Sequence, residues 1–105
     1  MRRFIPFLML VAIATPALAQ DVGDARAGRQ LAETWCANCH RIAPTGPGPA
    51  TDAAPAFAAI AAMPSTTPLA LRAFLQTPHR NMPNFQLSGE QTDNLIAYIM
   101  SLRAR

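Results

Sequence analysis

The sequence predicts a small all-α domain. Several segments place apolar side chains at the i, i+3 and i+4 spacing of a helix face, and none shows the regular alternation of a half-buried strand. Most of these segments follow an Asp, Thr or Ser, which are good N-caps, and proline- or glycine-rich stretches separate them. At 105 residues the chain holds one domain at most.

The first predicted helix runs from about Ala25 to Trp35, after the candidate N-caps Asp21 and Asp24. One face of it carries residues at i, i+3, i+4 and i+7: Gly28, Leu31, Ala32 and Trp35. A glycine inside a helix is a weak point unless another helix approaches it closely. We therefore expect a second helix to pack at Gly28.

Two shorter helices are predicted in the middle of the chain. Residues 55–62 begin with proline and continue with alanines, Phe57 and Ile60, which favours a short helix ending before Pro64. Thr67 and Pro68 then match the N-cap and first position of a third helix. Its apolar face is formed by Leu71, Phe74 and Leu75.

The last helix starts at a predicted capping box, with Ser88 at the N-cap and Gln91 at the third position. Its apolar stripe consists of Leu95, Tyr98, Ile99 and Leu102. We expect this stripe to pack against the Gly28 face of the first helix.

The only two cysteines lie in the sequence Cys36-Ala37-Asn38-Cys39-His40. Cys-x-x-Cys-His is the pattern of covalent c-type haem attachment. On one helical turn, residues i and i+3 face the same way, so two thiols can reach the two vinyl groups of one porphyrin. The next residue, His40, would then ligate the iron from the proximal side.

Two other readings of this motif stay open. A Cys-x-x-Cys pair can be a redox disulfide, or it can supply half of a zinc site. A zinc site needs four ligands, and beyond the motif only His79 is available, outside the usual spacing. A thioredoxin-like pair is expected at a strand-to-helix junction in a β-rich chain.

Met82 is the candidate for the second axial iron ligand. It lies in a proline-flanked loop, where a thioether has little reason to be a core residue, and the soft sulfur would raise the reduction potential. Met63 also precedes a proline, and His79 is a rival that would lower the potential. Arg80 is either a partner of a haem propionate or a solvated surface residue.

The loop of residues 41–54 is rich in Pro, Gly and Thr and passes the proximal side of the expected site. A metal-bound histidine usually donates its other ring N–H to a carbonyl or carboxylate. We expect the carbonyl of Pro47 to accept from His40, with Pro44 as the second choice. The alternative is that these prolines only stiffen the loop.

Residues 1–19 have the features of a secretory signal. Arg2 and Arg3 form a basic start, an apolar stretch too short to span a bilayer follows, and Ala17-Leu18-Ala19 precedes a cleavage point before Gln20. Residues 20–105 would then form the mature domain, with seven arginines, six acidic residues and no lysine. This charge excludes the dense basic stripe of a nucleic-acid binder, and membrane association is not expected.

Together these residues resemble the small monohaem class I cytochromes c of bacterial periplasms. The resemblance covers residues 24–103 and rests on the haem motif, the Asn81-Met82-Pro83 turn and the final helix. It implies the cytochrome c fold, with three main helices and a short one around one covalently bound haem. It also implies thioether bonds from Cys36 and Cys39, axial ligands His40 and Met82, and a crossing of the first and last helices near Gly28 and Tyr98.

The function expected from these features is one-electron transfer in the periplasm, without enzymatic activity. With both axial positions filled, the iron has no open site for a substrate. Redox partner proteins would dock transiently at the haem edge, and the protein would be a monomer or a subunit of a redox complex. The alternatives are a haem subunit of a dehydrogenase or oxidase, and a haem-based ligand binder or peroxidase.

Overall fold

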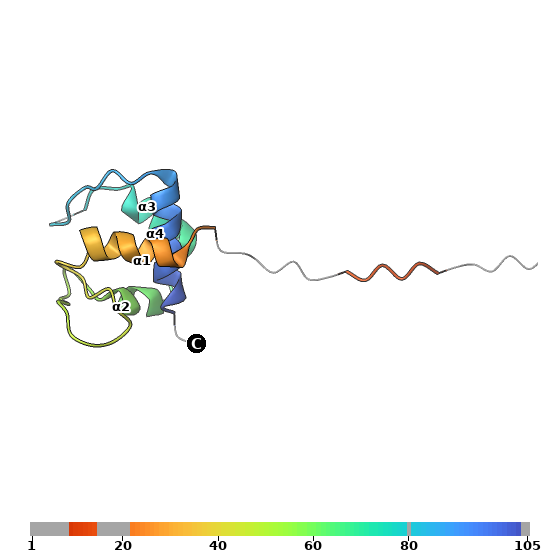
Figure 1. Ribbon diagram of the computed structural model, residues 1–105, viewed down its shortest axis with the longest axis horizontal. Coiled ribbons are helices and arrows are strands. Elements are labelled where there is room, and N and C mark those ends of the chain that lie inside the picture. The colour runs from red at the N-terminus through yellow and green to blue at the C-terminus, as the bar shows by residue number, and fades with distance from the viewer. Residues whose placement is uncertain (1–8, 15–21, 80, 104–105) are drawn as a thin grey trace, which may run out of the picture.

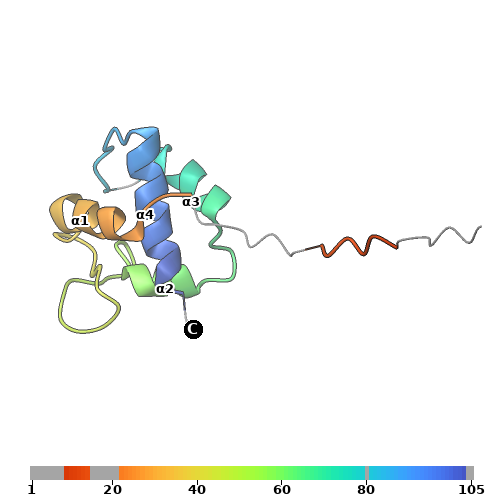
Figure 2. The same cartoon turned by 45° about the vertical axis from the view of Figure 1, so that its right-hand side comes forward.

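The computed structural model describes residues 9–14, 22–79 and 81–103. Within these ranges the regular structure is helical, and no strand occurs. The helices are α1 (Ala25–Trp35), α2 (Phe57–Ala62), α3 (Pro68–Leu75) and α4 (Gly89–Ser101). Helix α1 crosses α4, and α2 and α3 pack near opposite ends of α4 (Figures 1 and 2). The predicted all-α class is therefore confirmed.

Side-chain caps define where the longer helices begin. The Asp24 carboxylate accepts hydrogen bonds from the first turn of α1, and the Thr67 hydroxyl does the same for α3. At α4 the Ser88 hydroxyl accepts from the Gln91 N–H at 3.1 Å, and the Gln91 side chain accepts from the Ser88 N–H at 2.9 Å. This is the predicted capping box. Asp21, the other cap candidate for α1, lies outside the described residues.

Helix α2 begins two residues later than predicted, at Phe57 instead of Pro55. Its N-cap, Ala56, has an extended backbone with ψ 143° and no side chain that could cap the helix. Pro55 is therefore not the first helical residue, and it remains part of the preceding loop. Phe57 and Ala61 are the buried residues of this helix, and they face the core.

The core lies where α1 and α4 cross. Gly28 and Ala32 are the buried residues of α1, and a Cβ added at Gly28 would lie 2.9 Å from the Cβ of Tyr98. The crossing expected near Gly28 and Tyr98 is thus confirmed. Phe57 and Leu71 extend the same core from α2 and α3.

The long connection between α1 and α2 leaves the core and returns to it. Its middle, residues 44–53, is exposed, and Gly46 and Gly48 adopt positive φ angles of 96° and 148°. The ends of the connection are held together, because the Phe57 N–H donates to the Arg41 carbonyl at 2.9 Å. The Tyr98 hydroxyl also donates to the buried Ile42 carbonyl at 2.5 Å. These two bonds anchor the chain directly after His40.

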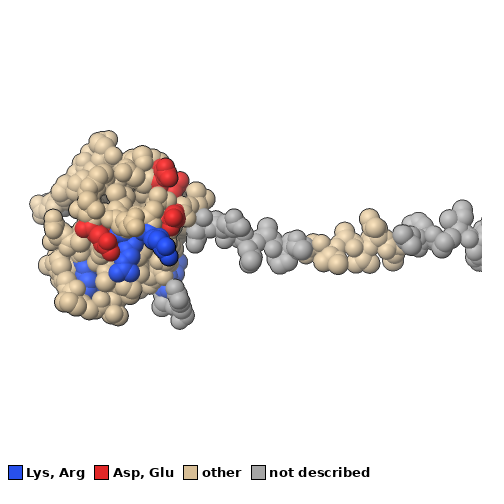
Figure 3. All heavy atoms as spheres, in the orientation of Figure 1, with Lys and Arg blue, Asp and Glu red and all other residues tan. Residues whose placement is uncertain are grey.

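Residues 9–14 extend away from the helices without regular structure (Figure 1). Their side chains are exposed, including Leu10 at 89% and Ile13 at 84%. In the described part of the chain, no helix is long and apolar enough to cross a membrane. On the face seen in Figure 3, acidic and basic side chains lie interspersed, and neither sign dominates.

Candidate haem-binding site

A cavity of about 390 Å³ opens between the end of α1, the end of the long loop, α3 and the loop before α4. Its wall is largely apolar, and the described residues that form it include no Asp, Glu, Lys or Arg. Cys36, Cys39, His40 and Met82 all line it. The fold therefore brings the motif to the same cavity as a methionine that follows His40 by 42 residues.

The two cysteines lie on the turn that continues α1. The N–H groups of Cys39 and His40 donate to the Cys36 carbonyl at 3.2 and 2.9 Å, so the motif keeps a helical spacing. Neither thiol is in a disulfide. Cys36 is half-buried and Cys39 is exposed, and both border the same cavity.

The environment of Cys36 opposes the two alternative readings of the motif. Burial raises the pKa of the Cys36 thiol to about 11. A reactive redox cysteine usually has a lowered pKa, because the thiolate is the nucleophile. In addition, no three His, Cys, Asp or Glu side chains within the described ranges lie close enough together to hold a metal ion. The site favours a neutral thiol beside an apolar surface.

The His40 ring is held by a hydrogen bond at Nδ1 and by aromatic packing against its face. Its Nδ1 lies 2.6 Å from the carbonyl oxygen of Pro55. A carbonyl can only accept, so Nδ1 carries the proton and donates it, which leaves the Nε2 lone pair free for a metal. The Phe57 ring packs against the imidazole with centroids 5.3 Å apart.

The carbonyl that accepts from His40 belongs to Pro55. The prediction that it belongs to Pro47, or as second choice to Pro44, is therefore wrong. Both of these prolines lie in the exposed outer part of the loop, and neither lines the cavity. The bond between Phe57 and Arg41 turns the returning end of the loop back under the motif, so Pro55 reaches His40 instead. A backbone acceptor leaves no signal in the residue type, because every residue has a carbonyl.

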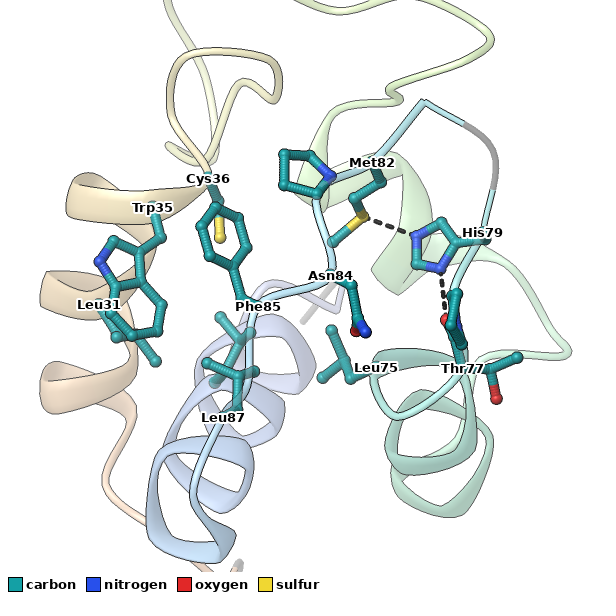
Figure 4. A pocket seen from close by; sticks show the side chains of 13 residues that line it. Leu31, Trp35, Cys36, Leu75, Thr77, His79, Met82, Asn84, Phe85 and Leu87 are labelled. Atoms are coloured by element: carbon teal, nitrogen blue, oxygen red, sulfur yellow. Dashed lines mark hydrogen bonds between the residues drawn. The ribbon is translucent and has the colours of Figure 1, made fainter.

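Met82 and His79 face each other in the loop between α3 and α4, as Figure 4 shows, and both also line the large cavity. The His79 Nε2 lies 2.6 Å from the Met82 sulfur, and its Nδ1 lies 2.9 Å from the Thr77 carbonyl oxygen. The imidazole also packs on Phe74, with ring centroids 3.9 Å apart. Both candidate distal ligands therefore reach the cavity, and Arg80 lies outside the described residues.

Aromatic residues line the cavity between α1 and the Met82 loop. Trp35 stacks on Phe85 with centroids 5.2 Å apart and an interplanar angle of 14°. The two rings also border a smaller cavity of about 20 Å³, shown in Figure 4. Sequence analysis did not assign a role to Phe85, although an aromatic residue three positions after Met82 in a polar loop was an available signal. Met63 lines the large cavity too, but it is 45% exposed.

The side chains of this cavity fit a covalently bound haem. Two thiols are spaced for two vinyl groups, and an imidazole has its Nε2 free. A thioether is available from another loop, and the remaining wall is mainly hydrophobic and aromatic. Soft sulfur and imidazole nitrogen are the axial donors found in cytochromes c.

Comparison with known proteins agrees with this chemistry. The family model described as Cytochrome C oxidase, cbb3-type, subunit III matches residues 23–99. The chain belongs to this cytochrome c family. Cytochrome c-552 of Bradyrhizobium diazoefficiens is 38% identical over 95 residues, which cover 90% of each chain. No solved structure matches the chain.

Membership of the cytochrome c family identifies the protein as a small monohaem electron carrier with covalently bound haem c. The predicted family, cofactor and electron-transfer function are confirmed at this level. Cys36, Cys39 and His40 have the Cys-x-x-Cys-His spacing that is typical of covalent c-type haem attachment.

Proposed function

We propose that this cytochrome is an exported one-electron carrier whose haem is bound by thioether bonds from Cys36 and Cys39. His40 is the proximal iron ligand and Met82 the distal one. The observation that carries this proposal is the single cavity of about 390 Å³ that all four side chains line. The haem, when bound, supplies an iron that accepts and releases one electron.

The chain's own residues would set the reduction potential. The hydrogen bond from His40 Nδ1 to the Pro55 carbonyl orients the imidazole and makes it a stronger donor. The Met82 thioether favours the reduced iron and raises the potential. The largely apolar wall would limit the access of water to the iron, which also tunes the reduction potential. With both positions filled, the site is closed to substrates.

Export is the second part of the proposal. Residues 1–19 act as a secretory signal that is cleaved after Ala19, and the protein works in the periplasm. The exposed apolar side chains of residues 9–14, which pack on no helix, support removal of this segment. Amino-terminal sequencing of the native protein should give Gln20 as the first residue, and a chain that retains Met1 would contradict cleavage.

The partners of the carrier are redox proteins. Two arrangements are compatible with the comparisons: a free carrier that docks transiently at the haem edge, or a haem subunit of an oxidase complex, as the family description suggests. The native size of the haem-containing species separates them. A monomer supports the free carrier, whereas a stable co-purifying complex supports the subunit.

The ferric absorption spectrum tests the ligand assignment. The weak near-red band of iron–methionine ligation should be present in the wild type and absent in Met82→Ala. Met63→Ala is the matched control, because Met63 lines the same cavity, and it should keep the band. A band lost in Met63→Ala and kept in Met82→Ala would overturn the assignment. A wild type without the band that binds carbon monoxide rapidly would indicate a ligand-binding haem protein instead.

A further inference from the structure

We infer that His79 is a reserve ligand of the haem iron, meaning a side chain that takes the distal position when the Met82 sulfur is lost. This inference rests on the proposed function, because it requires Met82 to be the resident distal ligand. It assigns to His79 a metal-binding role that is separate from the His40 and Met82 pair.

The first observation is the position of the His79 Nε2 atom. It lies 2.6 Å from the Met82 sulfur, and both side chains line the large cavity. The local backbone explains this contact. Asn81 has a left-handed φ of 62°, and the Met82 N–H donates to the His79 carbonyl at 3.4 Å. The two donor atoms thus occupy neighbouring points on the same side of the cavity.

The second observation is the state of the imidazole. Its Nδ1 lies 2.9 Å from the Thr77 carbonyl oxygen, which can only accept, so Nδ1 is the protonated nitrogen. In the neutral ring this leaves Nε2 without a hydrogen, and the neighbouring Met82 sulfur has no hydrogen to donate either. Both atoms are then electron-pair donors, and each is suited to bind the same Lewis acid.

The third observation is that His79 has the surroundings of a metal-binding histidine. Such residues usually donate the other ring N–H to a backbone carbonyl or a carboxylate. His40 does this with Pro55, and His79 does it with Thr77. The Phe74 ring supports the His79 imidazole at 3.9 Å, much as Phe57 supports His40 at 5.3 Å. The chain therefore carries two oriented histidines that border one cavity.

The consequence is a change of potential without loss of a six-coordinate iron. A thioether ligand raises the potential relative to an imidazole, so replacement of sulfur by His79 lowers it. Oxidation of the methionine would have the same effect: hydrogen peroxide transfers one oxygen atom to the sulfur, giving the sulfoxide and water. The iron would then stay closed to external ligands, while its lower reduction potential changes the driving force for electron transfer.

The test uses the purified haem-loaded protein at a single neutral pH. Met82→Ala and the volume-conserving Met82→Leu are compared with each of them combined with His79→Ala. Electron paramagnetic resonance reports the spin state, and voltammetry reports the potential. We expect both single variants to lose the near-red band, remain low-spin with a bis-imidazole signal, and show a lower potential. Both double variants should become high-spin in the ferric state. Their ferrous forms should bind carbon monoxide within the mixing time of the experiment.

His79→Ala alone is the control that separates this inference from the proposed function. It should keep the near-red band, because Met82 remains. If it keeps the band and both Met82 variants are high-spin, the reserve role is wrong and the Met82 assignment stands. If the wild type lacks the band and His79→Ala becomes high-spin, His79 is the resident ligand, and both proposals are wrong. A low-spin bis-imidazole signal that persists in the double variants also overturns the reserve role.

Discussion

The backbone of Gly28 lies directly against the backbone of Asn94. A Cβ added at residue 28 would lie 1.9 Å from the Asn94 carbonyl oxygen, closer than any real Cβ contact. The Asn94 side chain also accepts a hydrogen bond from the Asp24 N–H at 2.8 Å. The crossing of α1 and α4 is therefore fixed by a backbone contact that only glycine permits. The hydrogen bond from Asp24, the N-cap of α1, to the Asn94 side chain also holds it.

Gly28→Ala should destabilise the haem-loaded protein by about 3 kcal/mol, at the upper end of the usual cost of overpacking. The reason is that the added methyl group meets a backbone carbonyl, which cannot rotate away as a side chain would. Denaturant-induced unfolding, followed by circular dichroism, measures the change. Gly89→Ala is the matched control, because a Cβ there has open space and alanine favours the helix by up to about 1 kcal/mol. Equal effects at both sites would contradict the packing argument.

Tyr98→Phe should cost about 1–3 kcal/mol, because it leaves the buried Ile42 carbonyl without its hydrogen-bond donor. The ring volume and the packing on Phe57 are retained, so the loss reports the hydroxyl alone. Thermal unfolding of the two proteins gives the difference. A variant as stable as the wild type would show that water replaces this bond.

The same hydroxyl should make stability fall at alkaline pH. Burial raises the pKa of Tyr98 above its ordinary value of 10.0, and the Arg29 charge opposes this shift in part. The folded state therefore keeps the proton at pH values where the unfolded state has lost it. This contribution is complete below pH 10.0 and is lost as the pH rises toward the pKa of the folded protein. Unfolding free energies on either side of that pH should show a fall that is reduced in Tyr98→Phe.

Arg103→Ala should lower stability by about 1–2 kcal/mol, because one guanidinium donates to three carbonyls near the end of α2. The acceptors are Ala61 at 3.1 Å, Met63 at 3.2 Å and Thr66 at 2.9 Å. Arg103→Lys keeps the charge but not the planar fork, so it should recover less than half of the loss. Hydrogen exchange at Thr66 should accelerate in both variants, and unchanged exchange would argue against this anchor.

Pro47→Ala should leave the reduction potential unchanged, whereas Pro55→Gly should raise it. Glycine loosens the backbone that presents the Pro55 carbonyl to His40, which weakens the imidazole as a donor and destabilises the oxidised iron. The cost in stability should be about 0.5–1 kcal/mol, from the greater freedom of the unfolded chain. Voltammetry of both variants checks this, and a shift in Pro47→Ala alone would restore the original assignment to Pro47.

The sequence was sufficient to predict the helix caps and the Cys36–His40 motif, because their residues interact with near neighbours in the chain. The Ser88 and Gln91 capping box spans three positions, and the Thr67 cap acts on the following turn. The Cys36–His40 motif likewise lies within little more than one helical turn. Such features depend on side-chain type and spacing, both of which a sequence displays.

The carbonyl beside His40 could not be assigned in this way. Pro44, Pro47 and Pro55 are equivalent as acceptors, and their distance from His40 depends on the path of a loop. That path is closed by bonds from Phe57 and Tyr98, and the latter joins positions 56 residues apart. Backbone acceptors are identical in every residue, so only folded geometry distinguishes them.

The sequence by itself determined an all-α chain, the Cys36–His40 motif that predicts covalent haem attachment, and the four helices with their caps, apart from the two-residue shift of α2. Tertiary structure decided the rest: the Pro55 carbonyl beside His40, the Gly28 contact with Asn94, and the approach of His79 to the Met82 sulfur. Caps and periodic faces arise from interactions within a turn or two. The other contacts depend on how loops close, and loop closure is set by bonds between residues far apart in the chain.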